Sequence, residues 1–367
     1  MYQKTRFLFA SLTVLCFTGL SLYAQTSAPA LNYHDARNFP VINQYHQEPN
    51  FNRLPASYKA TVRPAVWALS MNSAGIAIRF RSNATNITAR WKVMHNANMA
   101  HMTATGVKGL DLYALVNNQW QFVNSGIPEG SFNFQRTLLQ DGDPGWREYL
   151  LFLPLYDGVD SLSIGIENGA EITAPQQLPL SDKQPIVYYG SSIIQGGCAS
   201  RPGMAITNIL TRRLQRPVIN LGFSGNGMFE SAVGAAICET KPALLIIDCN
   251  PNTAVELIHE RAVKLVQQLR ACHPTVPVLL VENYLYTGGN FHKAGKDADL
   301  QKRAELRKAF DDLIKAGVKN LHYQSGDGLI GDDLEGTIDS VHPTDIGMER
   351  FATKIQPMLQ RLLKAKS

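Results

Sequence analysis

Two adjacent serines, Ser191 and Ser192, end a run of apolar and aromatic residues in the stretch IVYYGSS. A serine hydroxyl attacks a carbonyl group only when a base takes its proton, a further group orients that base, and donors hold the negative oxygen that forms. A Gly-Ser-Ser sequence is also a common start of a helix, where serine caps the first turn. The chemistry therefore depends on partners elsewhere in the chain.

The stretch DSVHP near the C-terminus offers two such partners. Asp339 and His342 are three residues apart. In a turn this spacing lets the carboxylate accept the proton of the imidazole Nδ1, which leaves Nε2 facing a serine. The alternative interpretation is a helix-capping aspartate beside a surface histidine.

Donors for a negative oxygen are expected in two further stretches. NLGFSGNG contains Gly222, Gly225 and Gly227, and glycine lets a backbone N–H approach a ligand closely. DCNPN contains Asn250 and Asn252, either of which offers a side-chain amide. Glycine-rich turns and turn asparagines are usually structural, so only the combination of all these stretches favours catalysis.

The elements that must position these residues alternate between strand and helix after Gln184, which predicts a parallel sheet with right-handed crossovers. The expected strands are Ile186–Tyr189, Val218–Phe223, Ala243–Cys249, Val276–Glu282 and Asn320–Tyr323. The expected helices are Met204–Leu214, Glu230–Glu239, Thr253–Cys272, Ala298–Ala316 and Thr344–Lys364. A doubly wound sheet of five strands commonly has the order 2-1-3-4-5, which brings the ends of strands one and three together.

The preceding part of the chain has a different pattern. From residue 31 to 178, short segments alternate apolar and polar residues between Asn, Ser and Gly turns, as in DLYALVNNQWQFV. This pattern predicts an all-β sandwich. The turn-rich stretch from Glu167 to Pro185 reads as a linker, so we expect a sandwich domain over 31–178 and an α/β domain over 184–365.

The first 24 residues have the features of a secretory signal peptide. Lys4 and Arg6 precede an apolar stretch that begins at Phe7, and Ala24 precedes a polar segment. The alternatives are a lipoprotein signal at Cys16, which lacks the small residues expected before it, and a membrane anchor, for which the apolar core is short. We expect an exported protein, periplasmic or extracellular, with no membrane span after cleavage.

Charge and cysteine content exclude two classes of function. The formal charge of +5 falls to +3 when Lys4 and Arg6 are removed, which is too small and too evenly spread for a nucleic-acid-binding protein. The cysteines form no C-x-x-C pair, so neither a metal site nor a cofactor is expected. Export permits disulfides, and the predicted strand order favours one between Cys198 and Cys249, with two buried thiols as the alternative.

Taken together, YGSSIIQGGCASRPG, NLGFSGNG and DSVHP resemble the SGNH, or GDSL-like, hydrolase family over residues 184–365. The stretch HMTATGVKGLDLYAL, with Gly109 to Tyr113 as its signature, is similar to the GxDLY domain that precedes one branch of this family. The resemblance implies a flavodoxin-like three-layer α/β hydrolase domain with a parallel five-stranded sheet, preceded by an all-β sandwich domain.

The resemblance also implies roles for the catalytic residues. Ser192 stands at the nucleophile's position, and Ser191 replaces the usual aspartate, which is not a triad member. His342 matches the base and Asp339 its orienting acid. The N–H groups of Ser192 and Gly225 match two donors of the oxyanion hole.

The third oxyanion donor is an asparagine whose position the sequence leaves open. The family's G-x-N-D is not present as such. Asn252 fits if Asn250 occupies the glycine position, and Asn250 fits if Asp248 does. We favour Asn252, which lies further beyond the strand.

These residues and the signal pattern predict a secreted serine esterase that removes small acyl groups through an acyl-enzyme. The resemblance, to a family that includes many carbohydrate esterases, implies O-acetyl groups on carbohydrate as the substrate of this esterase. We expect Arg201, Glu282, Tyr284 and His292 to line its substrate pocket. The alternatives are a lipase or thioesterase, a glycan-binding protein without activity and, with less support, a serine peptidase. The sequence does not indicate which glycan is bound or how many chains assemble.

Overall fold

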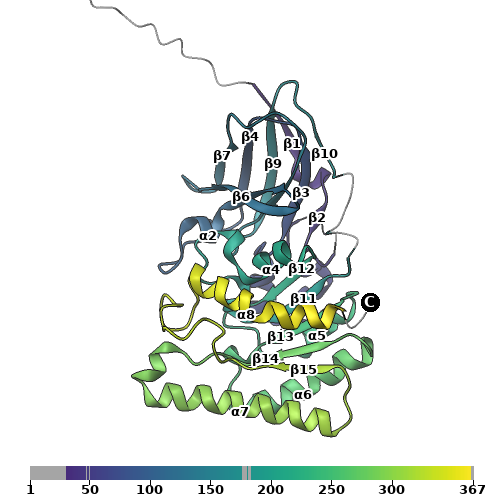
Figure 1. Cartoon of the computed structure of the whole chain (residues 1–367), viewed down its shortest axis with the longest axis vertical. Helices are drawn as coiled ribbons and strands as arrows, with labels where there is room; N and C mark the ends of the chain where they lie inside the picture. The colour runs from purple at the N-terminus through teal and green to yellow at the C-terminus, as the bar shows by residue number, and fades with distance from the viewer. Residues whose placement is uncertain (1–29, 47, 49, 176–179, 181–182, 365–367) are drawn as a thin grey trace, which may run out of the picture.

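The computed structural model describes residues 30–46, 48, 50–175, 180 and 183–364. An antiparallel β-sandwich occupies one end of the molecule, and a three-layer α/β unit occupies the other (Figure 1). The expected signal peptide lies outside the described residues, as do six residues of the expected linker. Within the described ranges, no helix combines the length and the apolar character needed to cross a membrane.

The sandwich consists of two antiparallel sheets whose inner faces form one core. Its strands are β1 (Leu31–Asp35), β2 (Val41–Ile42), β3 (Ala77–Ser82), β4 (Ile87–Val93), β5 (Leu110–Val116), β6 (Gln119–Gly126), β7 (Asn133–Leu139), β8 (Arg147–Phe152), β9 (Val159–Glu167) and β10 (Ile172–Thr173). One sheet has the order β1-β9-β4-β7, and the other β10-β3-β8-β5-β6 with β2 also paired to β3. In β4 the buried Trp91 lies between the exposed Arg90 and Lys92, the alternation that places one face of a strand in a core.

The α/β unit contains a five-stranded sheet with the predicted order. Its strands are β11 (Ile186–Gly190), β12 (Val218–Gly222), β13 (Leu244–Asp248), β14 (Val278–Val281) and β15 (Leu321–Gln324). All pairings are parallel, in the order β12-β11-β13-β14-β15. In β11, Ile186 and Tyr188 pack on one face while Val187 and Tyr189 pack on the other. Both faces are therefore covered, as in other parallel sheets.

Helices cover the two faces of this sheet. They are α3 (Ser192–Gln195), α4 (Ile206–Leu214), α5 (Ser231–Cys238), α6 (Val255–Cys272), α7 (Lys293–Lys315) and α8 (Asp345–Lys364). The apolar sides of α4 and α8 pack on one face, and those of α5, α6 and α7 pack on the other (Figure 1). Helix α7 begins five residues before the predicted start, because Gly295 in its first turn weakens the helical pattern.

Segments of the N-terminal half extend into the core of the α/β unit. Between β2 and β3 lie η2 (Ala56–Ala60) and α1 (Pro64–Ser70), and Leu54 and Val66 from this segment pack with α5 and α6. Leu155, after β8, packs with α4 and α8 on the opposite face. The two halves therefore share both apolar layers around the sheet.

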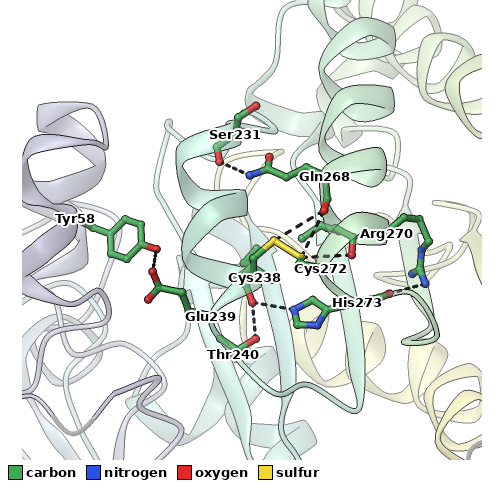
Figure 2. The surroundings of a disulfide bond; sticks show 11 residues. Tyr58, Ser231, Cys238, Glu239, Thr240, Gln268, Arg270, Cys272 and His273 are labelled. Atoms are coloured by element: carbon green, nitrogen blue, oxygen red, sulfur yellow. Dashed lines mark hydrogen bonds between the residues drawn. A yellow bond between two sulfur atoms is a disulfide. The ribbon is translucent and has the colours of Figure 1, made fainter.

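The structure corrects the predicted disulfide. Cys238 and Cys272, the last residues of α5 and α6, are bonded with a Cα–Cα distance of 5.6 Å (Figure 2). Cys198 and Cys249 are buried free thiols. They do not pair because Cys198 packs on the α4 and α8 face while Cys249 packs on the opposite face, so the sheet lies between them.

Candidate active site

Ser192 is placed by the sharp passage from β11 into α3. Ser191 caps this helix, since its Oγ accepts the N–H of Ile193 at 3.3 Å, and Ser192 is the first helical residue. A Cβ at Gly190 would lie 2.5 Å from the side chain of Ile194, so only glycine fits at the turn. The two serines therefore have different roles. The hydroxyl of Ser191 bonds the backbone of α3, whereas the hydroxyl of Ser192 is left for another partner.

That partner is His342. Ser192 Oγ lies 2.9 Å from His342 Nε2, and His342 Nδ1 lies 2.7 Å from Asp339 Oδ2. The other oxygen of Asp339 accepts the N–H of Val341 at 3.0 Å and of His342 at 2.7 Å. Ser340 completes the turn with a φ of 70°. A hydroxyl, an imidazole and a carboxylate joined in this order form the arrangement that activates a serine.

The charges around Ser192, His342 and Asp339 favour Ser192 over the neighbouring Cys198 as the nucleophile. Burial would raise the pKa of Asp339, but hydrogen bonds from the backbone and the ring of His342 outweigh it and hold that pKa below its ordinary value. The carboxylate therefore stays ionised and fixes the imidazole tautomer. Burial and the charge of Asp339 raise the pKa of Cys198 to about 12, so this neighbouring sulfur remains a thiol.

Two backbone donors are available beside Ser192. Among the described residues, no acceptor bonds the N–H of Ser192 or of Gly225. Gly225 has a φ of 66° and open space where a side chain would start. Gly222 and Gly227 have a different role, since a Cβ at either would lie within 2.1 Å of α3 or of the Gly190 carbonyl. They allow close backbone packing, whereas Gly225 exposes its N–H.

The two candidate asparagines differ in their surroundings. Asn250 is fully buried, and its Nδ2 donates to Asn283 Oδ1 at 2.6 Å. Asn252 is partly exposed at the end of η4 (Asn250–Asn252), and no described residue accepts a hydrogen bond from its Nδ2, whereas the amide oxygens of both asparagines are buried without a partner among the described residues. The amide of Asn252 is therefore the more available of the two for a ligand.

Arg201 and Glu282, expected in the substrate pocket, both have partners within the protein. Arg201 donates at 2.7 Å to the buried Asp111 of the sandwich and at 2.7 Å to the hydroxyl of Tyr113. Glu282 accepts the hydroxyl of Tyr323 at 2.7 Å and also pairs with arginine. A buried carboxylate needs such donors, which explains both arrangements.

Tyr284 contacts the turn from Asp339 to His342, and His292 follows a segment that is bonded to the same turn. Tyr284 is buried, and its hydroxyl donates to the carbonyl of Val341, next to His342. His292 is exposed, two residues after η5 (Thr287–Asn290), whose Thr287 N–H donates to Ser340 O at 3.2 Å. Tyr284 therefore supports the turn that holds the imidazole.

Two arginines from the N-terminal half, Arg53 and Arg63, hold the loop that carries Gly225, and no motif in the sequence points to either of them. The side chain of Arg53 is buried and donates to the carbonyls of Leu69, at 2.7 Å, and of Gly222. Burial lowers the pKa of Arg53 to about 9, which still leaves it protonated at neutral pH. Arg63 donates to the side chain of Asn226 at 2.9 Å and to its carbonyl at 3.1 Å.

The segment after β8 supports the same site from another side. Gln195 is fully buried; its Nε2 donates to Leu155 O at 3.1 Å, and its Oε1 accepts the N–H of Ser224 at 2.9 Å. Tyr156 donates its hydroxyl to Ser192 O at 3.3 Å. Gln195 therefore links the sandwich half to the loop of Gly225.

A third segment of the N-terminal half brings His101 to the site. Its ring centroid lies 5.8 Å from that of His342, and donor atoms of His101, Cys198 and His342 lie within 4.8 Å of one another. Such a nitrogen and sulfur set suits Zn²⁺, but an ion there would take His342 away from Ser192. His101 and Cys198 also border a cavity of about 670 Å³ whose walls include Ile338 and Ile346.

Comparison with known proteins now gives the family. The model of the GDSL-like lipase/acylhydrolase family matches residues 183–360, and that of the N-terminus of SGNH-hydrolase-type esterases matches residues 31–172. A crystal structure described as a GDSL-like lipase from Bacteroides ovatus is 36% identical, with a TM-score of 0.88 over 91% of this chain and 98% of that one. The chain belongs to the GDSL-like lipase/acylhydrolase family. It is a carboxylic ester hydrolase with the fold predicted from its sequence.

More distant structures share the fold of this GDSL-like hydrolase. The salicylyl-acyltransferase SsfX3 of a tetracycline biosynthetic pathway is 16% identical, with a TM-score of 0.74 over 92% of this chain and 98% of that one. A family two carbohydrate esterase from Clostridium thermocellum is 11% identical, with a TM-score of 0.57 over 91% and 99%. No curated protein matches the chain.

Proposed function

We propose that this hydrolase is exported and removes small acyl groups, foremost O-acetyl, from carbohydrate through an acyl-enzyme on Ser192. The observation that carries the chemical part is the continuous chain from Ser192 Oγ through His342 to Asp339, with contacts of 2.9 and 2.7 Å. The N-terminal signal pattern supports export.

The proposed reaction has two halves. Ser192 Oγ bonds to the ester carbonyl carbon while His342 Nε2 takes its proton, and the N–H groups of Ser192 and Gly225 with the Asn252 amide hold the oxyanion. The C–O bond to the sugar then breaks, and His342 returns the proton to the leaving alcohol. Water attacks the acyl-enzyme in the same way, which releases the acid and restores Ser192.

Two observations support a carbohydrate ester. Structures that share this fold include the Clostridium esterase, solved in complex with cellohexaose, and an acetyl xylan esterase from Butyrivibrio proteoclasticus, 10% identical with a TM-score of 0.57 over 91% of this chain and 99% of that one. The signal pattern would bring the enzyme to such polymers.

A longer acyl chain is the second candidate. The cavity beside His101 and Cys198 has apolar walls that include Met102, Ile338 and Ile346, and such walls favour an apolar group. The Bacteroides relative is also described as a lipase.

Acyl preference separates the two candidates. We expect p-nitrophenyl acetate to be cleaved with at least a tenfold higher kcat/KM than the octanoate, and acetate to be released from an acetylated glycan such as xylan or pectin. A higher kcat/KM for octanoate, with no acetate from any acetylated polysaccharide, would replace the carbohydrate proposal with the lipase one.

A further inference from the structure

A second cavity, of about 640 Å³, lies between the two halves of the molecule. Its walls come from the β5–β6 hairpin of the sandwich and from α4 and α8 of the α/β unit, where β6 lies against α4 (Figure 1). None of the residues that line it belongs to the site around Ser192. Its chemistry therefore requires a separate account.

Aromatic rings form one wall of this cavity. Trp120 is partly buried and packs on a small core that includes Tyr113 and Phe152. Phe122, on the same side of β6, is 46% exposed, and the guanidinium of Arg201 lies 4.0 Å above its ring. Rings held by packing on an otherwise polar wall provide the platform on which the apolar face of a sugar ring stacks.

One positive charge on the opposite wall lacks a carboxylate. Arg201 is paired with Asp111, and Arg213 is paired with Glu349. Arg212 is half-buried, with no described carboxylate within salt-bridge distance; its NH1 donates to the carbonyls of Gly203 at 2.7 Å and Asn208 at 3.1 Å.

The donors of Arg212 that bond no described residue indicate which chemical group the cavity would bind. Its Nε and second amino group have no acceptor among the described residues, and its guanidinium lies 4.1 Å over the Tyr113 ring. A planar guanidinium fixed in this way matches the geometry of a carboxylate. Burial lowers the pKa of Arg212 from its usual value, and an anion would offset that cost.

The rim adds groups that suit sugar hydroxyls. Asn118 lies in the β5–β6 turn and Gln119 begins β6. Gln215 directly follows α4, and Gln356 lies in α8. Amide groups donate and accept hydrogen bonds together. Gln215 donates to Asn118 O at 2.7 Å, which links the two halves across the rim.

We propose that this cavity binds an acidic sugar unit of a glycan, with its carboxylate on Arg212 and its ring against Trp120. The proposal rests on the carbohydrate part of the proposed function but not on the chemistry of Ser192. It gives the sandwich half a role in holding an acidic polymer while the ester is cleaved elsewhere.

Binding of two matched sugars to the full-length protein tests the proposal. The probes are trigalacturonate and the neutral trisaccharide in which CH2OH replaces each carboxylate, titrated by calorimetry. We expect saturable binding of the acid at least tenfold tighter than that of the neutral sugar. Equal affinities, or no saturable binding of the acid, would overturn the proposal.

Variants locate the site. Arg212→Gln should reduce the affinity for trigalacturonate to that for the neutral sugar, and Trp120→Ala should weaken both sugars at least tenfold. Trp146→Ala is the matched control, because Trp146 is likewise a tryptophan of the sandwich, is 39% exposed with the Arg81 guanidinium 4.6 Å over its ring, and does not line the cavity. Equal losses in Trp120→Ala and Trp146→Ala would contradict the assignment. Because Trp120 lies on an edge strand, this comparison holds even if Arg212→Gln fails to fold.

The esterase assay separates this proposal from the proposed function. Trp120→Ala and Arg212→Gln should keep the kcat/KM of the unaltered protein for p-nitrophenyl acetate, since neither residue borders Ser192. Acetate release from glycans without trigalacturonate binding would defeat only the cavity proposal. Tight binding without acetate release would defeat only the proposed function.

Discussion

Asn252 and Asn250 differ in how free their amides are, and this difference predicts which one matters for the reaction. The Nδ2 donor of Asn250 is bonded to Asn283, whereas no described residue accepts a hydrogen bond from Nδ2 of Asn252. Asn252→Ala should therefore lower kcat for p-nitrophenyl acetate by about 100-fold or more, the usual cost of one oxyanion donor, with KM little changed. Asn250→Ala should mainly destabilise the fold. If kcat fell in Asn250→Ala and not in Asn252→Ala, the third oxyanion donor would be Asn250.

Asp248 predicts a pH dependence of stability. This residue is 3% exposed at the end of β13, and burial raises its pKa to about 7 despite a hydrogen bond from Tyr188. A carboxyl whose pKa is higher in the folded than in the unfolded chain favours the fold only while it is protonated. The contribution of Asp248 to the free energy of unfolding is therefore complete below pH 4. As the pH rises to 7, the free energy of unfolding falls by roughly 4 kcal/mol.

Replacing the carboxyl removes this dependence. Asp248→Asn should raise the free energy of unfolding at pH 8 and leave it nearly unchanged at pH 4, as measured by urea denaturation at both values. An equal effect at the two pH values would show that Asp248 does not titrate in this way.

Single residues could be predicted where the signal was local. Asp339 and His342 share one turn, and Ser192 follows a strand, so type and spacing together with the family resemblance select three residues that the structure joins by hydrogen bonds. Arg63 could not be selected, because its partner Asn226 is 163 residues away and no motif surrounds either residue. For Arg201 and Glu282 the sequence does not reveal that buried neighbours use their charges, and their place in the substrate pocket stays a prediction.

At the scale of elements, the segment with η2 and α1 holds the loop after β12. Arg63 bonds Asn226, next to Gly225, and also Glu230 at the start of α5. Arg63→Ala should lower kcat by about tenfold without raising KM, because the Gly225 N–H loses its fixed position. Steady-state kinetics with p-nitrophenyl acetate measure this split.

Arg136→Ala is the matched control for Arg63. Arg136 is also on the surface of the N-terminal half and also bonds a carboxylate and a carbonyl, those of Glu129 and Ile127. Its loss should leave kcat unchanged. A change in KM alone for Arg63→Ala, or equal effects of the two variants, would contradict a positioning role.

The order of the strands could be predicted because parallel crossovers follow strict rules of handedness and adjacency. The disulfide could not be predicted from that order alone, since strand ends do not show on which face a side chain lies. A signal was nevertheless present: Cys238 and Cys272 each end a helix, and these two helices cover the same face of the sheet.

At the scale of the whole molecule, the two halves act as one support for the active site. Asp111 of the sandwich is fully buried and accepts bonds from Arg201 and from the N–H of Gly203 in the other half. Asp111→Ala leaves this arginine without its carboxylate, so the free energy of unfolding should fall by about 3 kcal/mol. Urea denaturation measures this loss.

Ser125→Ala provides the comparison for Asp111. Ser125 Oγ donates to Asp111 at 2.7 Å from within the sandwich, so its removal leaves the contact between the halves intact. We expect a loss of about 1 kcal/mol. If Asp111→Ala costs no more than this, the ion pair does not join the halves.

The most direct measurement of the central claim is the rate at which the Ser192→Ala protein hydrolyses p-nitrophenyl acetate. If an acyl-enzyme on Ser192 carries the reaction, kcat should fall by at least about 1,000-fold, while the thermal unfolding temperature stays within a few degrees. A folded Ser192→Ala protein that keeps the kcat of the unaltered enzyme would contradict the account.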